Sequence, residues 1–273
     1  MTVTGGHILT NLYGGNEMTN VTGTCNVTMT GGTLGVPRTL SQIAAHPVTC
    51  YLFGAGKGDQ RTHFNTSTNV GKANVKVGGN AIIYGSVFGG GEDGHVLEDI
   101  NVEIQNNGLA FTVGTGENQK TYHFPIIGTT GTSYVDGNIF GGGRGFSGDA
   151  LTAGSVGGNI NVDIKGGTML GSIYGGGRLA SVGTNFAAPN DPLYGSFKED
   201  VLYKDGDTDI PTGKQVGDIR TPYGHITVNI SGGTIGNDVA DAKYGGNVYG
   251  GSMGRLELLN GLANPLWAQL AQA

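Results

Sequence analysis

The sequence predicts an all-β protein, a parallel β-solenoid (β-helix) that carries loop insertions and ends in a short helical cap or joint. Two recurring motifs and a glycine-rich composition with few charges predict this fold. The solenoid repeats are expected over residues 1–254, and the helical cap or joint over 255–273. Insertions into the repeats are expected at about 36–49, 106–133 and 185–223.

The first motif is an aliphatic residue, an aromatic residue and a run of glycines, as in GNIFGGGR at 137 and GSIYGGGR at 171. The shortest spacings between its aromatic residues are 34 and 35 residues. A repeat unit of that length is typical of a stacked architecture, and the longer intervals are expected to contain the insertions. The aromatic position recurs at Tyr13, Phe53, Phe88, Phe140, Tyr174 and Tyr249.

The second motif is an alternating strand that closes on Gly-Gly, as in NVDIKGGTMLG at 161. Val162 and Ile164 alternate with polar residues, which indicates a strand with one buried face. Glycine then turns the chain, because it tolerates positive φ without a steric penalty. A unit of two or three short strands cannot bury its apolar face alone, so we expect copies to stack into one continuous core.

Composition agrees with stacking and bears on the partners. Charged residues make up 13 % of the chain and glycine contributes 54 of 273 residues, as expected where columns of like charge would be unfavourable. A β-propeller would need four strands per blade, and collagen would need glycine at every third position. The net charge of −6 and the scattered basic residues argue against a nucleic-acid partner. No stretch is long and apolar enough to predict insertion into a membrane.

The opening MTVTGGHILT already belongs to a repeat and lacks the basic start and apolar core of a secretion signal. Two interpretations stay open at this point. The chain is a piece of a larger protein, which we favour, or its first edge meets another molecule. The final segment RLELLNGLANPLWAQLAQA breaks the repeat pattern, and its Asn264-Pro265 pair suits the start of a helix.

The aromatic column is the first candidate site. Adjacent strand residues face opposite sides, so if the aliphatic residue of each motif is in the core, the rings would form an exposed ladder able to bind sugars or another filament. The alternative, which we favour, is a structural column packed beneath glycine corners or insertions. The residues are Tyr13, Phe53, Phe88, Phe140, Tyr174 and Tyr249.

Two further candidates involve acids and cysteines. Asp205, Asp207 and Asp209 alternate as oxygen ligands do in Ca²⁺ loops, but Ile210 and Val216 stand where an EF-hand needs glycine and an acid. This is a weak Ca²⁺ candidate, and no other cofactor is expected. Cys25 and Cys50 are about one turn of a solenoid apart, so they would form either a disulfide between turns or two buried free thiols.

The motifs VNISGGTIG and GNVYGG, followed by GSMGRLELLNGLANPLW, resemble repeats of very large, glycine-rich, adhesin-like surface or secreted proteins of Bacteroidetes. The resemblance covers most of the chain outside its insertions. It implies an extracellular β-helical stalk or adhesin at the cell surface and assigns no catalytic residue.

The expected function is therefore a non-enzymatic, extracellular structural or adhesive solenoid that self-associates end to end into fibres, with host or microbial glycans as candidate partners. One alternative is a polysaccharide-binding or polysaccharide-degrading β-helix protein, a lyase or hydrolase, for which paired carboxylates would be needed. Another is a segment of a virus or phage fibre. The acids near one another in the sequence are Glu92, Asp93, Glu98 and Asp99, and also Glu199 and Asp200.

Overall fold

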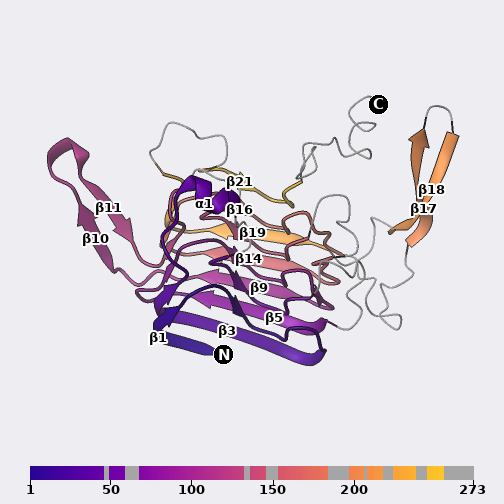
Figure 1. The fold of residues 1–273 in the computed structure, drawn as a ribbon, viewed down its shortest axis with the longest axis horizontal. Coiled ribbons are helices and arrows are strands. Elements are labelled where there is room, and N and C mark those ends of the chain that lie inside the picture. The colour runs from indigo at the N-terminus through magenta and orange to yellow at the C-terminus, as the bar shows by residue number, and fades with distance from the viewer. Residues whose placement is uncertain are drawn as a thin grey trace.

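Strands are the main regular structure of the described residues, and most of them pair in parallel (Figure 1). The computed structural model describes residues 1–45, 49–58, 68–131, 136–145, 153–183, 197–205, 208–217, 224–237 and 245–254. Within these ranges the helical elements are α1 (Leu40–Ala45) and one 3-10 turn, η1 (Gly116–Asn118). None of the described helices is long and apolar enough to cross a bilayer.

The longer strands form a first row in which each strand pairs in parallel with the next one of the row. Val75 lies opposite Val102, Val102 opposite Val162, and Val162 opposite Val228, so equivalent residues of the second motif are in register. The alternating sequence gives alternating burial, with Val162 in the core and Asn161 toward solvent. The row contains β1 (Thr2–Ile8), β3 (Val21–Leu34), β5 (Asn69–Val77), β9 (Ile100–Ile104), β14 (Ile160–Ile164) and β19 (Ile226–Ile230).

Two-residue strands form a second row, also parallel. Except for the one at Ile126–Ile127, which follows the insertion that begins near residue 106, they follow a Gly-Gly corner. Strand β3 is long enough to continue through this corner, since its Thr33 and Leu34 pair with the first short strand. The first two rows are therefore one 11-stranded sheet, which curls through 300°. The short strands are β6 (Ile82–Ile83), β12 (Ile126–Ile127), β15 (Thr168–Met169) and β20 (Thr234–Ile235), and β8 (His95–Val96) pairs with the start of β5.

The aliphatic-aromatic pairs of the first motif form a third row, a separate six-stranded parallel sheet. Aliphatic residues pair with aliphatic and aromatic with aromatic, as Ile139 does with Ile173 and Phe140 with Tyr174. The strands are β2 (Leu12–Tyr13), β4 (Leu52–Phe53), β7 (Val87–Phe88), β13 (Ile139–Phe140), β16 (Ile173–Tyr174) and β21 (Val248–Tyr249).

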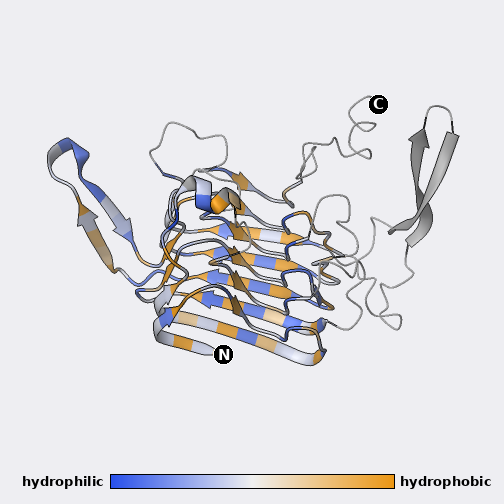
Figure 2. Ribbon diagram, in the orientation of Figure 1, coloured by the Kyte–Doolittle hydropathy of each residue, from blue (hydrophilic) through white to orange (hydrophobic). Residues whose placement is uncertain are grey.

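The core has two parts, which the third row separates. Aliphatic residues from all three rows fill the main cluster, including Ile83, Val162 and Ile139. The aromatic residues of the third row pack in a second cluster with Tyr51 and Ile43. Figure 2 shows the apolar and polar residues alternating along the stacked strands. The third row thus buries both faces over most of its length.

Glycine has two different roles at the corners. In the second motif the second glycine has positive φ, for example +85° at Gly167, which a side chain would oppose. After each aromatic residue, glycine is needed because there is no room for a side chain. A Cβ added at Gly141 would lie 2.1 Å from the carbonyl oxygen of Gly175 in the adjacent strand connection. The glycine run therefore lets successive copies approach closely.

Regular structure occupies parts of all three expected insertions. Helix α1 lies in the first, where Thr39 Oγ1 accepts from the Gln42 backbone N–H at 3.4 Å and Gln42 Oε1 accepts from the Thr39 N–H at 2.9 Å, a capping box. The hairpin of β10 (Ala110–Val113) and β11 (Lys120–His123) projects from the stack (Figure 1). Strands β17 (Phe197–Asp205) and β18 (Thr208–Gly217) pair antiparallel.

The expectation of an all-β fold with parallel pairing is confirmed. Most corners between these strands carry Gly-Gly or a glycine run, whereas β9 is followed by Gln-Asn-Asn-Gly. The expected helical cap or joint at 255–273 lies outside the described residues.

Candidate functional site

The six aromatic residues of the first motif form one continuous stack. Neighbouring ring centroids lie 4.6–5.2 Å apart, and the planes of Phe88 and Phe140 differ by only 11°. Such offset stacking adds to the stabilisation from burial. The order of the rings is Tyr13, Phe53, Phe88, Phe140, Tyr174 and Tyr249.

The inner rings of this aromatic column are covered. Phe53, Phe88 and Phe140 are at most 1 % exposed, and Tyr174 is 7 % exposed. Tyr51 packs against both Phe53 and Phe88, with centroids 6.0 and 5.5 Å away. Tyr249, the last ring of the column, is 43 % exposed. A ligand can therefore reach the ends of the column but not the faces of its inner rings.

A buried group of charged side chains lies beside the first ring of the column. Arg144 contacts Glu92 Oε1 at 3.3 Å and Asp93 Oδ2 at 3.0 Å, and all three side chains are at least 90 % buried. The Tyr13 hydroxyl donates to Glu92 Oε2 and accepts from Asn11 Nδ2 at 3.2 Å. Burial, together with the Glu92 carboxylate, raises the pKa of Tyr13 well above its usual value.

The contact between Glu92 and Arg144 could have been predicted from the positions of the two residues in the first motif. Glu92, Arg144 and Arg178 each follow three consecutive glycines. Stacking of the copies brings the first two together, so opposite charges at one motif position indicate a contact between layers. The two carboxylates follow β7 and Arg144 follows β13, the next strand of the third row. We therefore interpret these ion pairs as contacts that hold two successive layers together.

The neighbouring acids also have structural partners. Glu98 Oε2 lies 3.1 Å from Lys72 Nζ, and Asp99 Oδ1 accepts from the Asn159 backbone N–H at 2.8 Å. The side chains of Glu199 and Asp200 lie outside the part that the structure describes.

A serine and a histidine meet inside the stack, at positions that sequence reasoning did not single out. His95 Nδ1 lies 2.6 Å from Ser155 Oγ, and it also accepts from the Ser155 backbone N–H at 3.2 Å. Both residues are 0 % exposed. This pair has the spacing of a nucleophile and its base, but its burial leaves no approach for a substrate, so its role is to satisfy buried polar groups.

The two cysteines are buried free thiols. Cys25 lies within β3 among the aliphatic core residues, opposite Ala73 of β5. Cys50 has a φ of +68° at a corner two residues before β4, where its Sγ is 3.8 Å from the Val36 carbonyl oxygen. The structure contains no disulfide between these two residues.

The weak Ca²⁺ candidate falls on the β17–β18 ribbon. Asp205 ends β17 opposite Thr208, and Asp209 lies in β18 opposite Lys204. Asp207 and the side chains of the other two aspartates lie outside the described residues. Among the side chains that the structure describes, no group of three His, Cys, Asp or Glu residues is placed to hold a metal ion.

Comparison of the chain with protein-family models, with curated proteins and with solved structures returned no match. The resemblance to adhesin-like repeats thus remains a prediction from the motifs. The stacked strands, the aromatic column and the surface features of the described residues are therefore what bear on function.

Proposed function

We propose that the chain is a parallel β-solenoid that serves as a non-enzymatic structural or adhesive element outside the cell, of the glycine-rich, adhesin-like kind. Each turn would contribute one strand to each row and lie on the turn before it. The observation that carries this proposal is the pairing of equivalent residues in successive copies, in all three rows. A molecule built in this way gains length by adding layers and keeps one cross-section.

Side-chain ladders on the first row support a structural role. Asn74 Nδ2 donates to Asn26 Oδ1 at 2.9 Å, and Asn101 Nδ2 donates to Asn74 Oδ1 at 2.9 Å. Each amide satisfies the next, so the exposed face is ordered without columns of like charge. Glu103 lies opposite another acid, Asp163, but it has two cationic partners, Lys165 Nζ at 2.9 Å and Lys76 Nζ at 3.7 Å. These contacts stiffen the surface of the stack.

End-to-end association is the second part of the proposal. Ile230, Val248 and Tyr249 in the last layer are 44, 47 and 43 % exposed, whereas their counterparts Ile164, Ile139 and Phe140 are fully buried. The last layer thus presents the residue types that the stack buries elsewhere. A first layer from a second copy has matching types in Leu12 and Tyr13, so a head-to-tail contact would continue the aromatic column.

Electron microscopy of the purified chain over a concentration series, together with size-exclusion chromatography, tests both parts. Filaments of constant width that lengthen with concentration would support end-to-end association, and Val248→Glu should shorten them by placing a charge in the joint. Thr227→Glu, on an exposed position of the same layer, is the matched control. Single short rods at every concentration would overturn the association, and compact particles would overturn the solenoid.

A further inference from the structure

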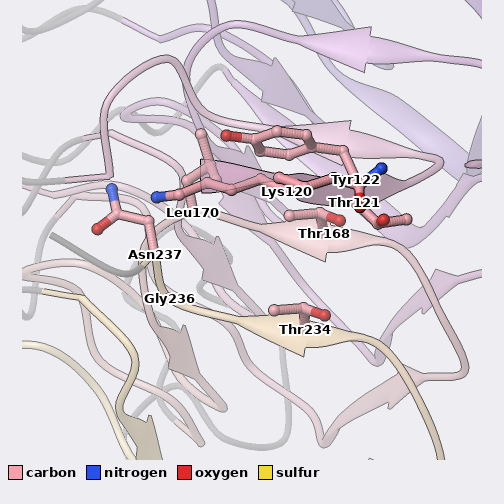
Figure 3. Close-up of a pocket in the computed structure, with 9 residues that line it drawn as sticks. Lys120, Thr121, Tyr122, Thr168, Leu170, Thr234, Gly236 and Asn237 are labelled. Carbon is pink, nitrogen blue, oxygen red and sulfur yellow. The ribbon is translucent and has the colours of Figure 1, made fainter. Parts of the chain in front are cut away.

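The β10–β11 hairpin presents one edge to the stack and the other edge away from it. A hollow lined in part by Tyr122, Thr168 and Thr234 lies between β11 and the second row of strands, as Figure 3 shows. At the end of β11 the His123 backbone N–H donates to Thr168 Oγ1 at 2.9 Å. The edge of β11 is therefore turned toward the stack, and the edge of β10 is the outer one.

The pairing within the hairpin shows which backbone groups of β10 lie on this outer edge. The Phe124 N–H donates to the Leu109 carbonyl at 2.9 Å, and the two strands then pair without a register shift. Hydrogen-bonded and non-hydrogen-bonded pairs alternate in an antiparallel ladder, so Phe111 bonds to β11. Ala110 and Thr112 direct their N–H and C=O groups outward. No hydrogen bond found among the described residues involves these outward groups.

One face of β10 is apolar and exposed. Leu109, Phe111 and Val113 alternate along it, and they are 50, 41 and 52 % exposed. Phe111 stacks on Tyr122 with ring centroids 5.4 Å apart, so this ring of β11 belongs to the same face. A two-stranded ribbon with an apolar face gains stability when further strands are added to it. β10 also lacks the lysine, proline or bulge with which natural edge strands prevent such pairing.

The sequence of β10 is complementary to a second copy of itself. If two β10 strands pair antiparallel through their outer edges, Ala110 of each copy forms a hydrogen-bonded pair with Thr112 of the other. Phe111 then lies opposite Phe111, and Leu109 opposite Val113, with all of these side chains on the apolar face. β10 contains no charged residue, so this twofold pairing brings no like charges together.

We propose that the outer edge of β10 is an interaction surface for a second copy of the chain, and that two hairpins join through it into one four-stranded antiparallel sheet. The paired segment, 109–113, is short compared with the roughly 20–30 residues a side of a stable interface, so a single contact is weak. The contact joins copies side by side. It involves the hairpin alone, so it does not depend on end-to-end association through the last layer.

Cysteine cross-linking of the full chain tests the register of this contact. Leu109→Cys and Val113→Cys are prepared separately, mixed and mildly oxidised. In the proposed pairing the two positions have Cα atoms about 4.5 Å apart, which suits a disulfide. Mass spectrometry of the linked peptides should therefore show several-fold more mixed dimers than dimers of either variant with itself. The wild type, whose two cysteines are buried, is the control. The proposal is overturned if mixed and same-variant dimers form equally, or if no dimers form.

Sedimentation velocity over a concentration series tests the outer edge itself. Val248→Glu serves as the background, because it suppresses end-to-end association, and we expect it to form dimers with a Kd of about 0.1–1 mM. Adding Thr112→Pro removes an outward N–H without breaking the bonds between β10 and β11, so it should weaken dimerisation about tenfold. Thr112→Val keeps that N–H and should dimerise as the background does. Far-ultraviolet circular dichroism shows that each variant is folded. A background that stays monomeric, or a Thr112→Pro variant that dimerises as well as Thr112→Val, would overturn the proposal.

Discussion

Phe88 and Phe140 stack with their ring centroids 4.6 Å apart, although the segment between them contains the whole β10–β11 hairpin. Their strands, β7 and β13, nevertheless pair residue for residue. The insertion leaves from one corner and returns to the next strand without altering the register of the layers. The aromatic column thus brings together rings from successive copies of the motif, although the number of residues between the copies varies.

Replacing a ring in the middle of this column should be costly. Phe140→Ala removes a side chain that is 0 % exposed and contacts the rings of Phe88 and Tyr174. We expect the free energy of unfolding to fall by about 3–5 kcal/mol, measured by urea denaturation. Tyr249→Ala, at the 43 % exposed end, should cost less than half as much. Equal losses for the two variants would contradict an energetic role for burial in the column.

The glycine after each ring gives a second, steric prediction. At Gly141 an added methyl group would meet the Gly175 carbonyl oxygen, whereas at Gly250 it would meet nothing within 4 Å. Gly141→Ala should therefore destabilise the fold by about 1–3 kcal/mol through overpacking. Gly250→Ala occupies the same motif position and should have little effect. Thermal unfolding of both variants checks this, and a stable Gly141→Ala would show that the layers can separate without penalty.

The sequence could predict the features that depend on one repeat at a time. Alternation around Val162 indicated a strand with one buried side, and the recurrence of Phe88 and Phe140 at one motif position predicted a column. In the structure these residues pair as their motif positions suggest. Local pattern and stacking agree here because these copies share the residue types of their strands, and most share glycine at their corners.

Features made by different repeats and insertions were not predictable in the same way. Ile43 and Tyr51 pack against the aromatic column from within and just after an insertion, and no repeat pattern places them. The hollow brings Tyr122 near Thr168 and Thr234, which belong to two later layers. Their proximity depends on how the hairpin leaves the stack, which alternation and turn residues do not specify.

The Arg144 ion pairs offer a test of the buried charges. Arg144→Gln would remove the guanidinium that both buried carboxylates, Glu92 and Asp93, contact, so we expect a loss of about 3–5 kcal/mol in the free energy of unfolding. Lys72→Gln, which breaks the exposed pair with Glu98, should cost only about 0–1 kcal/mol. Adding Glu92→Gln and Asp93→Asn to Arg144→Gln should recover part of the loss in urea denaturation. A cost no larger than that of Lys72→Gln would show that solvent reaches these carboxylates.

Alkaline pH should weaken the fold through Tyr51. This residue is fully buried, and burial raises its pKa to about 12 against the positive charges of Arg178 and Arg38, which lower it. Because the pKa in the folded state exceeds the unfolded value of about 10, the stabilisation is complete below pH 10 and is lost as the pH rises toward 12. Burial also raises the pKa of Tyr174 to about 12, so this residue has the same effect on stability.

Urea denaturation at about pH 9 and about pH 11.5 checks this. The free energy of unfolding should decline less between these pH values for Tyr51→Phe than for the wild type, and less again for the double variant with Tyr174→Phe. Parallel declines in all three proteins would mean that other groups with raised pKa values, such as the Cys25 thiol and the Lys165 ammonium group, govern the alkaline limit.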